Sequence, residues 1–155
     1  MIRSIPLHRR PRHRRLALLL GVAAVASASL VSTAGPAAAV TCSGYGCDRQ
    51  NPYGSGCQTG SVVKYDVPLG MGPRVRLHYS AACRTVWASI YDVPSGWQSY
   101  ADVHRNSDGL ELYCYPGSYS SCYTNMLYDG GVTSHAYGWV SFGSGGTEAV
   151  ATPDY

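Results

Sequence analysis

Short stretches in which apolar and polar residues alternate recur along the chain after residue 40. From Arg74 to Tyr79 the apolar side chains occupy every second position, so they fall on one face of an extended strand and the polar ones on the other. Leu110, Leu112 and Cys114 alternate with their neighbours in the same way. No stretch after residue 40 has a sustained helical period. The pattern predicts strands over residues 61–67, 74–79, 86–91, 97–103, 110–115, 122–127, 134–142 and 147–151.

Turn signals separate these stretches. Residues 106–109 read Asn-Ser-Asp-Gly, and residues 129–131 read Asp-Gly-Gly. Glycine, asparagine and aspartate tolerate the positive φ that tight hairpins require, and proline presets φ in the turns at residues 68–70 and 94–96. Short strands at intervals of about 8–12 residues are typical of all-β sandwiches and barrels. We therefore predict a small antiparallel β-barrel or β-sandwich of about seven or eight short strands.

The first 39 residues have the three parts of a secretory signal peptide. A head with six arginines and no acid is followed by an apolar run over residues 16–25, and residues 37–39 read Ala-Ala-Ala. A membrane anchor is the alternative, but the run is shorter than the ~20 apolar residues that a span needs. We predict cleavage between Ala39 and Val40, with no membrane span in the mature chain. Two adjacent arginines before the apolar run leave open whether export uses the general secretory or the twin-arginine route.

Removal of this segment reverses the sign of the net charge. The full chain carries +3, but its first 15 residues hold half of its twelve basic side chains, so residues 40–155 carry −3. Proteins that bind nucleic acid usually present a strongly positive face. Residues 40–155 offer only Arg74, Arg76 and Arg84 as a basic group. The sequence therefore predicts an extracellular chain that does not bind nucleic acid.

All cysteines lie in residues 40–155, a length that suits one domain and not two. An even number of cysteines in an exported chain predicts disulfides, because the extracellular space is oxidising. A zinc site is the alternative, but no C-x-x-C pair occurs. A turn-rich stretch between Cys114 and Cys122 favours a disulfide between them, while the other pairings stay open, with Cys57 or Cys47 as the partner of Cys83. The six are Cys42, Cys47, Cys57, Cys83, Cys114 and Cys122.

The aromatic composition is unusual, with thirteen tyrosines and a single phenylalanine. Rows of aromatic rings on a β-surface can bind sugars by stacking, with the hydroxyl groups at the rim. Tyrosine also suits the half-buried face of a thin sheet, where its ring packs and its hydroxyl reaches water. Packing is the simpler interpretation, and sugar binding is the functional alternative.

The sequence contains no motif that commits it to catalysis. The histidines after residue 40 lack the spacing of a metal-binding pair, and there is no G-x-S-x-G motif. Asp102 and His104 share one face of a predicted strand, where a distant serine would complete a triad, but this pattern arises easily by chance. We interpret Asp102, Asp108, Glu111 and Asp129 as turn and solvent-face residues. We therefore expect no catalytic residues, no cofactor and no metal ion.

Two further groups of polar residues have simple structural interpretations. Asp48 and Asn51 could bind a cation, but two oxygens fall well short of the six to eight ligands of calcium, so an Asx turn is favoured. Arg74, Arg76 and His78 could meet an anionic surface, although such a row is more often the solvent-facing side of a strand.

Two stretches together resemble a known family. Residues 42–57 contain Cys-x4-Cys-Asp-x-x-Asn-Pro-x4-Cys, and residues 75–88 read Val-Arg-Leu-His-Tyr-Ser-Ala-Ala-Cys-Arg-x-x-Trp-Ala. They are similar to the motifs of the YjfA-like secreted bacterial proteins, known as domain of unknown function 2690, and residues 123–129 resemble the C-terminal part of that family. The chain departs from the pattern at Arg49, where glycine is usual, and at Asn51, where aspartate is usual. The resemblance implies a small extracellular or wall-associated domain and supplies no activity.

The function predicted from these features is binding outside the cell without catalysis. An exported, aromatic-rich, disulfide-stabilised chain without a catalytic set favours a secreted, monomeric module that binds an envelope glycan or an extracellular protein. A small secreted inhibitor or toxin-like protein is the first alternative, because rigid bridged scaffolds present loops well. A hydrolase that uses Asp102, His104 or His135 is the second alternative and has the weakest support.

Overall fold

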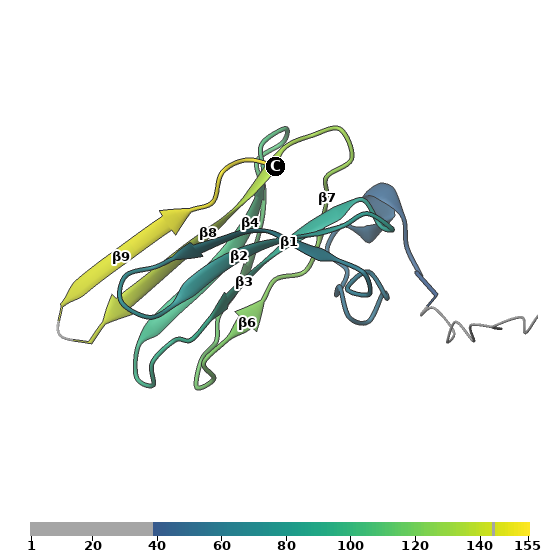
Figure 1. Ribbon diagram of the computed structural model, residues 1–155. Coiled ribbons are helices and arrows are strands. Elements are labelled where there is room, and N and C mark those ends of the chain that lie inside the picture. The colour runs from purple at the N-terminus through teal and green to yellow at the C-terminus, as the bar shows by residue number, and fades with distance from the viewer. Residues whose placement is uncertain (1–38, 144) are drawn as a thin grey trace, which may run out of the picture. The chain divides into compact units, whose positions relative to one another are not determined.

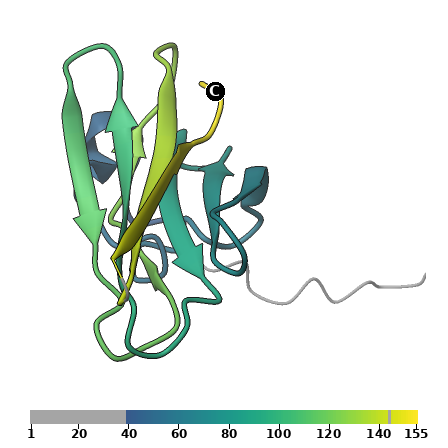
Figure 2. The same ribbon diagram turned by 90° about the vertical axis from the view of Figure 1, so that its left-hand side faces the viewer.

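Nine β-strands form two antiparallel sheets in the computed structural model, which describes residues 39–143 and 145–155. Sheet A has the strand order β1-β2-β3-β6, with β7 also paired to β3 (Figure 1). Sheet B has the order β5-β4-β8-β9, and its four strands lie side by side in Figure 2. The bounds are η1, a 3₁₀ helix (Gly44–Cys47), β1 (Val62–Pro68), β2 (Arg74–Ser80), β3 (Thr85–Tyr91), β4 (Gln98–Arg105), β5 (Leu110–Cys114), β6 (Cys122–Tyr123), β7 (Leu127–Tyr128), β8 (Ser134–Phe142) and β9 (Gly146–Ala151).

The predicted all-β antiparallel fold is confirmed, and the two sheets form a sandwich, not a closed barrel. The signal peptide predicted for residues 1–39 lies outside the described residues, apart from Ala39 itself, so cleavage before Val40 stays a prediction. Within the part of the chain that the structure describes, no helix is long and apolar enough to span a membrane.

The stretch predicted as one strand over residues 122–127 forms two short strands instead, β6 and β7, which both pair with β3. Between them the Thr124 hydroxyl accepts the backbone N–H of Ala88 at 3.1 Å. The segment before β1, residues 39–61, is called the N-terminal loop. Met126 exchanges backbone hydrogen bonds with it, accepting from Arg49 at 2.8 Å and donating to Gln50 at 2.9 Å. The chain leaves β3 at this point because the loop supplies other partners for its backbone groups.

The main hydrophobic core lies between the two sheets. The period-two alternation places Val75 and Leu77 of β2 and Ala101 and Val103 of β4 in it, all with no exposed surface. Each fully buried valine or leucine side chain stabilises the fold by about 1.5–3 kcal/mol. The remaining core members are Leu69, Val86, Ala88, Ile90, Val93, Cys114, Leu127, Ala136 and Val140.

Three disulfides hold the sandwich and its N-terminal loop together, and they account for all six cysteines. Cys114–Cys122, the pair that the turn-rich spacing favours, joins the end of β5 in sheet B to β6 in sheet A. Cys57–Cys83 joins the N-terminal loop to the turn after β2, and Cys42–Cys47 closes the loop around η1. Disulfides persist in oxidising surroundings, so three of them indicate a compartment outside the reducing cytoplasm.

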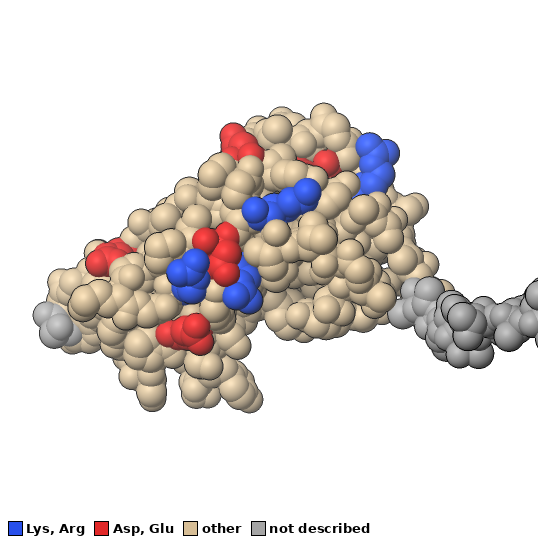
Figure 3. Space-filling model, in the orientation of Figure 1, with Lys and Arg blue, Asp and Glu red and all other residues tan. Residues whose placement is uncertain are grey.

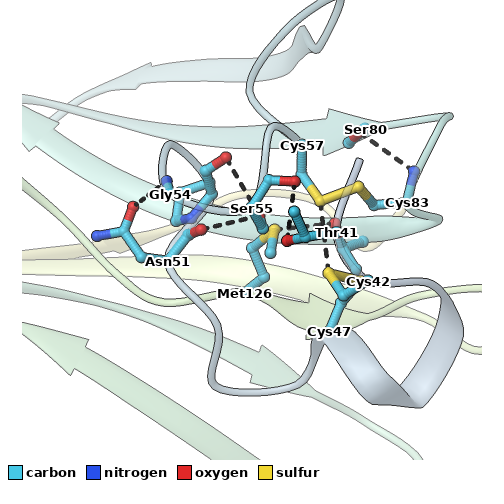
Figure 4. The surroundings of a disulfide bond; sticks show 12 residues. Thr41, Cys42, Cys47, Asn51, Gly54, Ser55, Cys57, Ser80, Cys83 and Met126 are labelled. Carbon is cyan, nitrogen blue, oxygen red and sulfur yellow. Dashed lines mark hydrogen bonds between the residues drawn. A yellow bond between two sulfur atoms is a disulfide. The ribbon is translucent and has the colours of Figure 1, made fainter. Parts of the chain in front are cut away.

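A second apolar cluster surrounds two of these disulfides. Cys47, Cys57 and Cys83 pack there with Trp87 and Met126, all at most 1% exposed. Figure 4 shows Met126 beside the sulfur atoms, below the strand that carries Ser80. The N-terminal loop therefore has a small core of its own, which packs on the outer side of sheet A.

The backbone of this loop explains two features of its sequence. The Asn51 Oδ1 accepts the N–H groups of Tyr53 at 2.9 Å and Gly54 at 3.1 Å, which is the Asx turn favoured above (Figure 4). Arg49 has a φ of 65°, in the left-handed region that favours glycine. Glycine is the usual residue at this position in the family that the sequence resembles.

Candidate ligand-binding site

The outer face of sheet B carries the candidate site. On β4 the inward residues alternate with Tyr100, Asp102 and His104, which point away from the core. The pairing register sets the neighbours of each: Tyr100 lies opposite Trp139, Asp102 opposite Tyr113 and Tyr137, and His104 opposite Glu111 and His135. We call these eight residues of β5, β4 and β8 the strip: Tyr100, Asp102, His104, Glu111, Tyr113, His135, Tyr137 and Trp139.

One end of the strip is aromatic. The rings of Tyr100 and Trp139 stack at 23° with centroids 5.6 Å apart. The rings of Tyr113, Tyr115 and Tyr137 surround Tyr100 at centroid distances of 5.8, 5.8 and 6.0 Å. Aromatic pairs at such separations attract each other, by about 0.5–1.5 kcal/mol per pair, so the rings hold one another in place.

A shallow cavity of about 290 Å³ opens at this aromatic end. Its walls include Trp97, Tyr100, Tyr115 and Trp139, and Gln98 and Ser99 supply polar groups beside them. Trp97 is itself fixed by an edge-on contact with Phe142, at 4.5 Å between centroids. A surface built from fixed rings with a few polar groups is typical of sites for small ligands.

The other end of the strip is polar. The imidazole rings of His104 and His135 stack at 15° with centroids 4.9 Å apart. The His104 Nδ1 donates to the Glu111 carboxylate at 2.8 Å, and the His135 Nδ1 donates to the Asp154 carboxylate at 3.1 Å. The Glu111 carboxylate also accepts the Tyr113 hydroxyl. The two imidazole–carboxylate bonds fix the rotation of both rings. The bonds from Tyr113 and His104 lower the pKa of Glu111, and those from Asn106 and His135 lower the pKa of Asp154.

Asp102 lies in a pocket of about 230 Å³ at this polar end. It is only 6% exposed, so the interpretation of Asp102 as a solvent-face residue is wrong: the rings of Tyr113 and Tyr137 on the adjacent strands remove it from water. Its pKa is raised to about 6, chiefly by desolvation and then by the nearby negative charge of Glu111, while His104 opposes the shift. None of the described residues donates a hydrogen bond to its carboxylate. The carboxylate oxygens are open to the pocket and not fully enclosed, because no fully buried side-chain oxygen or nitrogen of the described residues lacks a partner.

The interpretation of Asp129 as a solvent-face residue is also wrong. It is 7% exposed and its Oδ1 accepts the Ser134 hydroxyl at 2.7 Å. Burial raises its pKa to about 6 as well. Asp108 and Glu111, in contrast, lie at the surface, where Asp108 binds Arg105.

The structure brings together some of the residues considered for catalysis and separates others. Asp102, His104 and His135 share the polar pocket, but the Nδ1 of His104 bonds to Glu111, and no serine lines this pocket. His78 lies on sheet A, where it stacks on Trp87 at 5.1 Å and bonds to the Ser89 hydroxyl at 2.9 Å. Desolvation lowers the pKa of His78 to about 4, so it is neutral at physiological pH.

The basic row on β2 is neutralised by its own neighbours. Arg74 and Arg76 both bind the carboxylate of Asp66, at 2.6 and 2.9 Å. On the face shown in Figure 3, acidic and basic side chains of the described residues lie beside one another and form no continuous patch of one sign. Arg74 and Arg76 are therefore paired and face solvent as expected, but the expectation is wrong for His78 of the same row, which is desolvated beside Trp87.

Metal-binding side chains do not converge at the strip. Among the described residues, the only group of three or more His, Cys, Asp or Glu side chains with converging ligand atoms is the four-cysteine cluster of the N-terminal loop, whose sulfurs lie within 4.8 Å of one another. Those sulfurs are bonded as Cys42–Cys47 and Cys57–Cys83. Asp48 does not form the Asx turn that was favoured for it together with Asn51, because its carboxylate accepts hydrogen bonds from Arg105 and from the backbone N–H of Tyr128.

The arrangement of the strip was not predicted from the sequence. Sugar binding by rows of tyrosines was considered as an alternative to packing, but the rows were not located, and Trp139 and Glu111 were not connected with Asp102. The missing information was that β4 pairs with both β5 and β8. With that register, the side chains of the strip lie side by side on three adjacent strands.

The chain was compared with known proteins. The family model described as protein of unknown function (DUF2690) matches residues 45–137. The uncharacterized protein YjfA of Bacillus subtilis (strain 168) is 31% identical over 108 residues, which cover 59% of this chain and 69% of that protein. No solved structure matches the chain. The residues matched by the family model include most of the N-terminal loop, the Cys57–Cys83 disulfide and most of the strip, and the chain belongs to the DUF2690 family of proteins of unknown function.

Proposed function

We propose that the protein is a non-enzymatic module that binds an extracellular or envelope glycan on the outer face of sheet B. The observation that carries this proposal is the stacked pair Tyr100–Trp139 with Tyr115 beside the cavity at the aromatic end. The flat faces of sugar rings are apolar and stack on such side chains, while their hydroxyl groups need polar partners at the rim.

The strip supplies both kinds of contact along one line. Successive rows on a strand are about 7 Å apart, so the three rows offer neighbouring positions to successive rings of a linear oligosaccharide. The aromatic end presents ring faces, and the polar end presents imidazole, carboxylate and hydroxyl groups. The rings and imidazoles are held by mutual contacts, so little side-chain freedom is lost when a ligand binds.

A binding assay with truncated rings tests the proposal. Residues 40–155 are tested by pull-down on insoluble peptidoglycan, chitin and cellulose, and by calorimetry with N-acetylglucosamine hexamer and cellohexaose. We expect retention on at least one polymer, and a loss of about tenfold in affinity for Trp139→Ala and for Tyr115→Ala, which corresponds to about 1.4 kcal/mol.

Tyr53→Ala is the matched control, because Tyr53 is 55% exposed and packs on Tyr123, away from the strip. It should bind like the unmodified chain. Absence of binding to every glycan, or equal binding by the Trp139→Ala chain, contradicts the proposal.

The proposed ligand requires that the chain leave the cell, and we propose cleavage after Ala39 followed by secretion. The three disulfides and the signal-like residues 1–39 support this. Mass spectrometry of protein from culture medium should find a chain that begins at Val40 and has no free thiol. An intact leader or reduced cysteines would contradict secretion by this route.

A second candidate function, glycan hydrolysis, is favoured by one observation. The polar pocket contains a carboxyl group with a pKa near 6 beside two imidazoles, which suits proton transfer near neutral pH. Mass analysis of oligosaccharides after prolonged incubation distinguishes the two functions: binding without shortened products supports the module, and turnover that Asp102→Asn abolishes supports the hydrolase.

A further inference from the structure

We propose that the polar end of the strip binds a protonated primary amine, so that the preferred glycan contains amino sugars whose nitrogen is not acylated. This inference rests on the proposed glycan binding and names the class of sugar. It starts from Asp102, whose buried carboxylate lines the pocket without a hydrogen-bond donor from the described residues.

Asp102 differs in this respect from the other acids that lie in poorly exposed positions. Asp129 accepts the Ser134 hydroxyl, and Asp48 accepts two bonds from Arg105. The Asp102 carboxylate keeps its lone pairs for a donor that enters the pocket, because no described residue bonds to it. A ligand that brings a donor forms a hydrogen bond there, and a charged donor forms the strongest one.

The charge of the surrounding groups selects a cation over a neutral hydroxyl. The carboxylates of Glu111 and Asp154 lie at the same end of the strip as Asp102, each bonded to one imidazole. The phenol rings of Tyr113 and Tyr137 flank Asp102 across the strands, and the faces of aromatic rings attract cations. An ammonium group therefore meets a carboxylate and aromatic rings within one pocket of about 230 Å³.

A metal ion fits the same residues poorly. The ligand atoms of Asp102, Glu111 and the two histidines do not converge, and among the described residues only the disulfide-bonded cysteines do. Both histidines also use Nδ1 for carboxylates. A primary amine needs only one well-placed carboxylate, because its three hydrogens can be shared among neighbouring acceptors.

Titration of the pocket gives the proposal a second readout. Asp102 has a pKa of about 6, so it is mostly ionised at neutral pH and mostly protonated at about pH 5. Affinity for the amine should therefore fall as the pH falls. The titratable groups that face Asp102 are Tyr100 and His104 of β4, Glu111 and Tyr113 of β5, His135 and Tyr137 of β8, and the nearby Asp154.

The experiment compares two oligosaccharides that differ only in N-acylation. Calorimetry with residues 40–155 near neutral pH uses glucosamine hexamer and N-acetylglucosamine hexamer. We expect the free amine to bind at least about tenfold more tightly, and this preference to disappear at about pH 5. Asp102→Asn should remove the preference for the free amine, so that the ratio of the two affinities falls to about one.

Asp129→Asn is the matched control, because it removes another buried acid with a raised pKa that does not line the pocket, and it should keep the preference. Equal affinity of the unmodified chain for both hexamers, or tighter binding of the acetylated one, overturns this inference and leaves the proposed function standing. Binding of neither hexamer or of any other glycan overturns both. The comparison with the unmodified chain does not depend on the folding of any variant.

Discussion

The guanidinium of Arg105 on β4 binds the carboxylate of Asp48, 57 residues earlier in the chain, through two hydrogen bonds of 3.0 and 2.9 Å. The Arg105 side chain is 3% exposed, and its remaining nitrogens bond to Asp108 at 3.0 and 2.7 Å. The pair connects the N-terminal loop to sheet B, and Asp48 also accepts the backbone N–H of Tyr128 in β7 of sheet A.

This contact predicts the largest single-residue effect outside the core. Removing one partner of a buried ion pair leaves a charge without compensation, so Arg105→Ala should lower the free energy of unfolding by about 3–5 kcal/mol. Urea denaturation measures the change. Asp108→Ala removes a half-exposed partner of the same arginine and should have an effect below about 1 kcal/mol. Similar losses for the two variants would show that the Asp48 contact does not stabilise the fold.

How much of this could be predicted depends on the distance over which each signal acts. Alternation within β2 is a local signal, and it correctly placed Val75 and Leu77 in the core. The burial of Asp102 is not local, because it depends on tyrosines from β5 and β8 and on their register. A slip of one residue would move every one of those side chains to the other face.

The same distinction applies to the N-terminal loop. The Asx turn at Asn51 follows from the chemistry of one side chain and was predicted. Arg105, the partner of Asp48, lies on β4 and could not be identified from the loop alone. Six cysteines likewise allow about fifteen pairings. Short-range turn composition favoured Cys114–Cys122, while the partner of Cys83 could be narrowed only to Cys47 or Cys57.

Close approach of the two sheets makes Gly138 a sensitive position. A Cβ at residue 138 on β8 would overlap the Val75 side chain of β2. Overpacking of this kind is usually unfavourable by about 1–3 kcal/mol, so Gly138→Ala should lower the melting temperature. Gly143→Ala is the control, since nothing lies within 4 Å of a Cβ built there. A melting temperature for Gly138→Ala equal to that of the control would mean that the sheets can separate freely at this point.

The disulfides should differ in their contributions according to the loops that they close. In the chain-entropy model, Cys57–Cys83, with a sequence separation of 26, contributes about 3.5 kcal/mol. Cys114–Cys122, with a separation of 8, contributes about 2.5 kcal/mol. Urea denaturation of Cys57→Ala/Cys83→Ala and Cys114→Ala/Cys122→Ala compares the two pairs. A larger loss for the shorter loop would indicate that linking β5 to β6 matters more than loop closure.

Stability at acidic pH should depend on His78. Its pKa is about 4 in the folded chain because burial beside Trp87 disfavours the charged ring, while the ordinary value is 6.5. A lowered histidine pKa stabilises the fold fully above pH 6.5, and this contribution is lost as the pH falls towards 4. Asp102 and Asp129 act in the opposite sense, because their pKa values of about 6 favour the folded state as the pH falls below 6.

The two effects can be separated by substitution. Between neutral pH and about pH 4.5, the unmodified chain should lose about 2 kcal/mol of unfolding free energy relative to His78→Gln, because the aspartates are common to both chains and cancel. Over the same pH range, Asp129→Asn should lose more unfolding free energy than the unmodified chain, because it removes a group that stabilises the fold at acidic pH. Urea denaturation at several pH values measures the difference. If the unfolding free energies of His78→Gln and of the unmodified chain change equally with pH, His78 is protonated as readily in the folded chain as in the unfolded one, and the stacked imidazole is accessible to water.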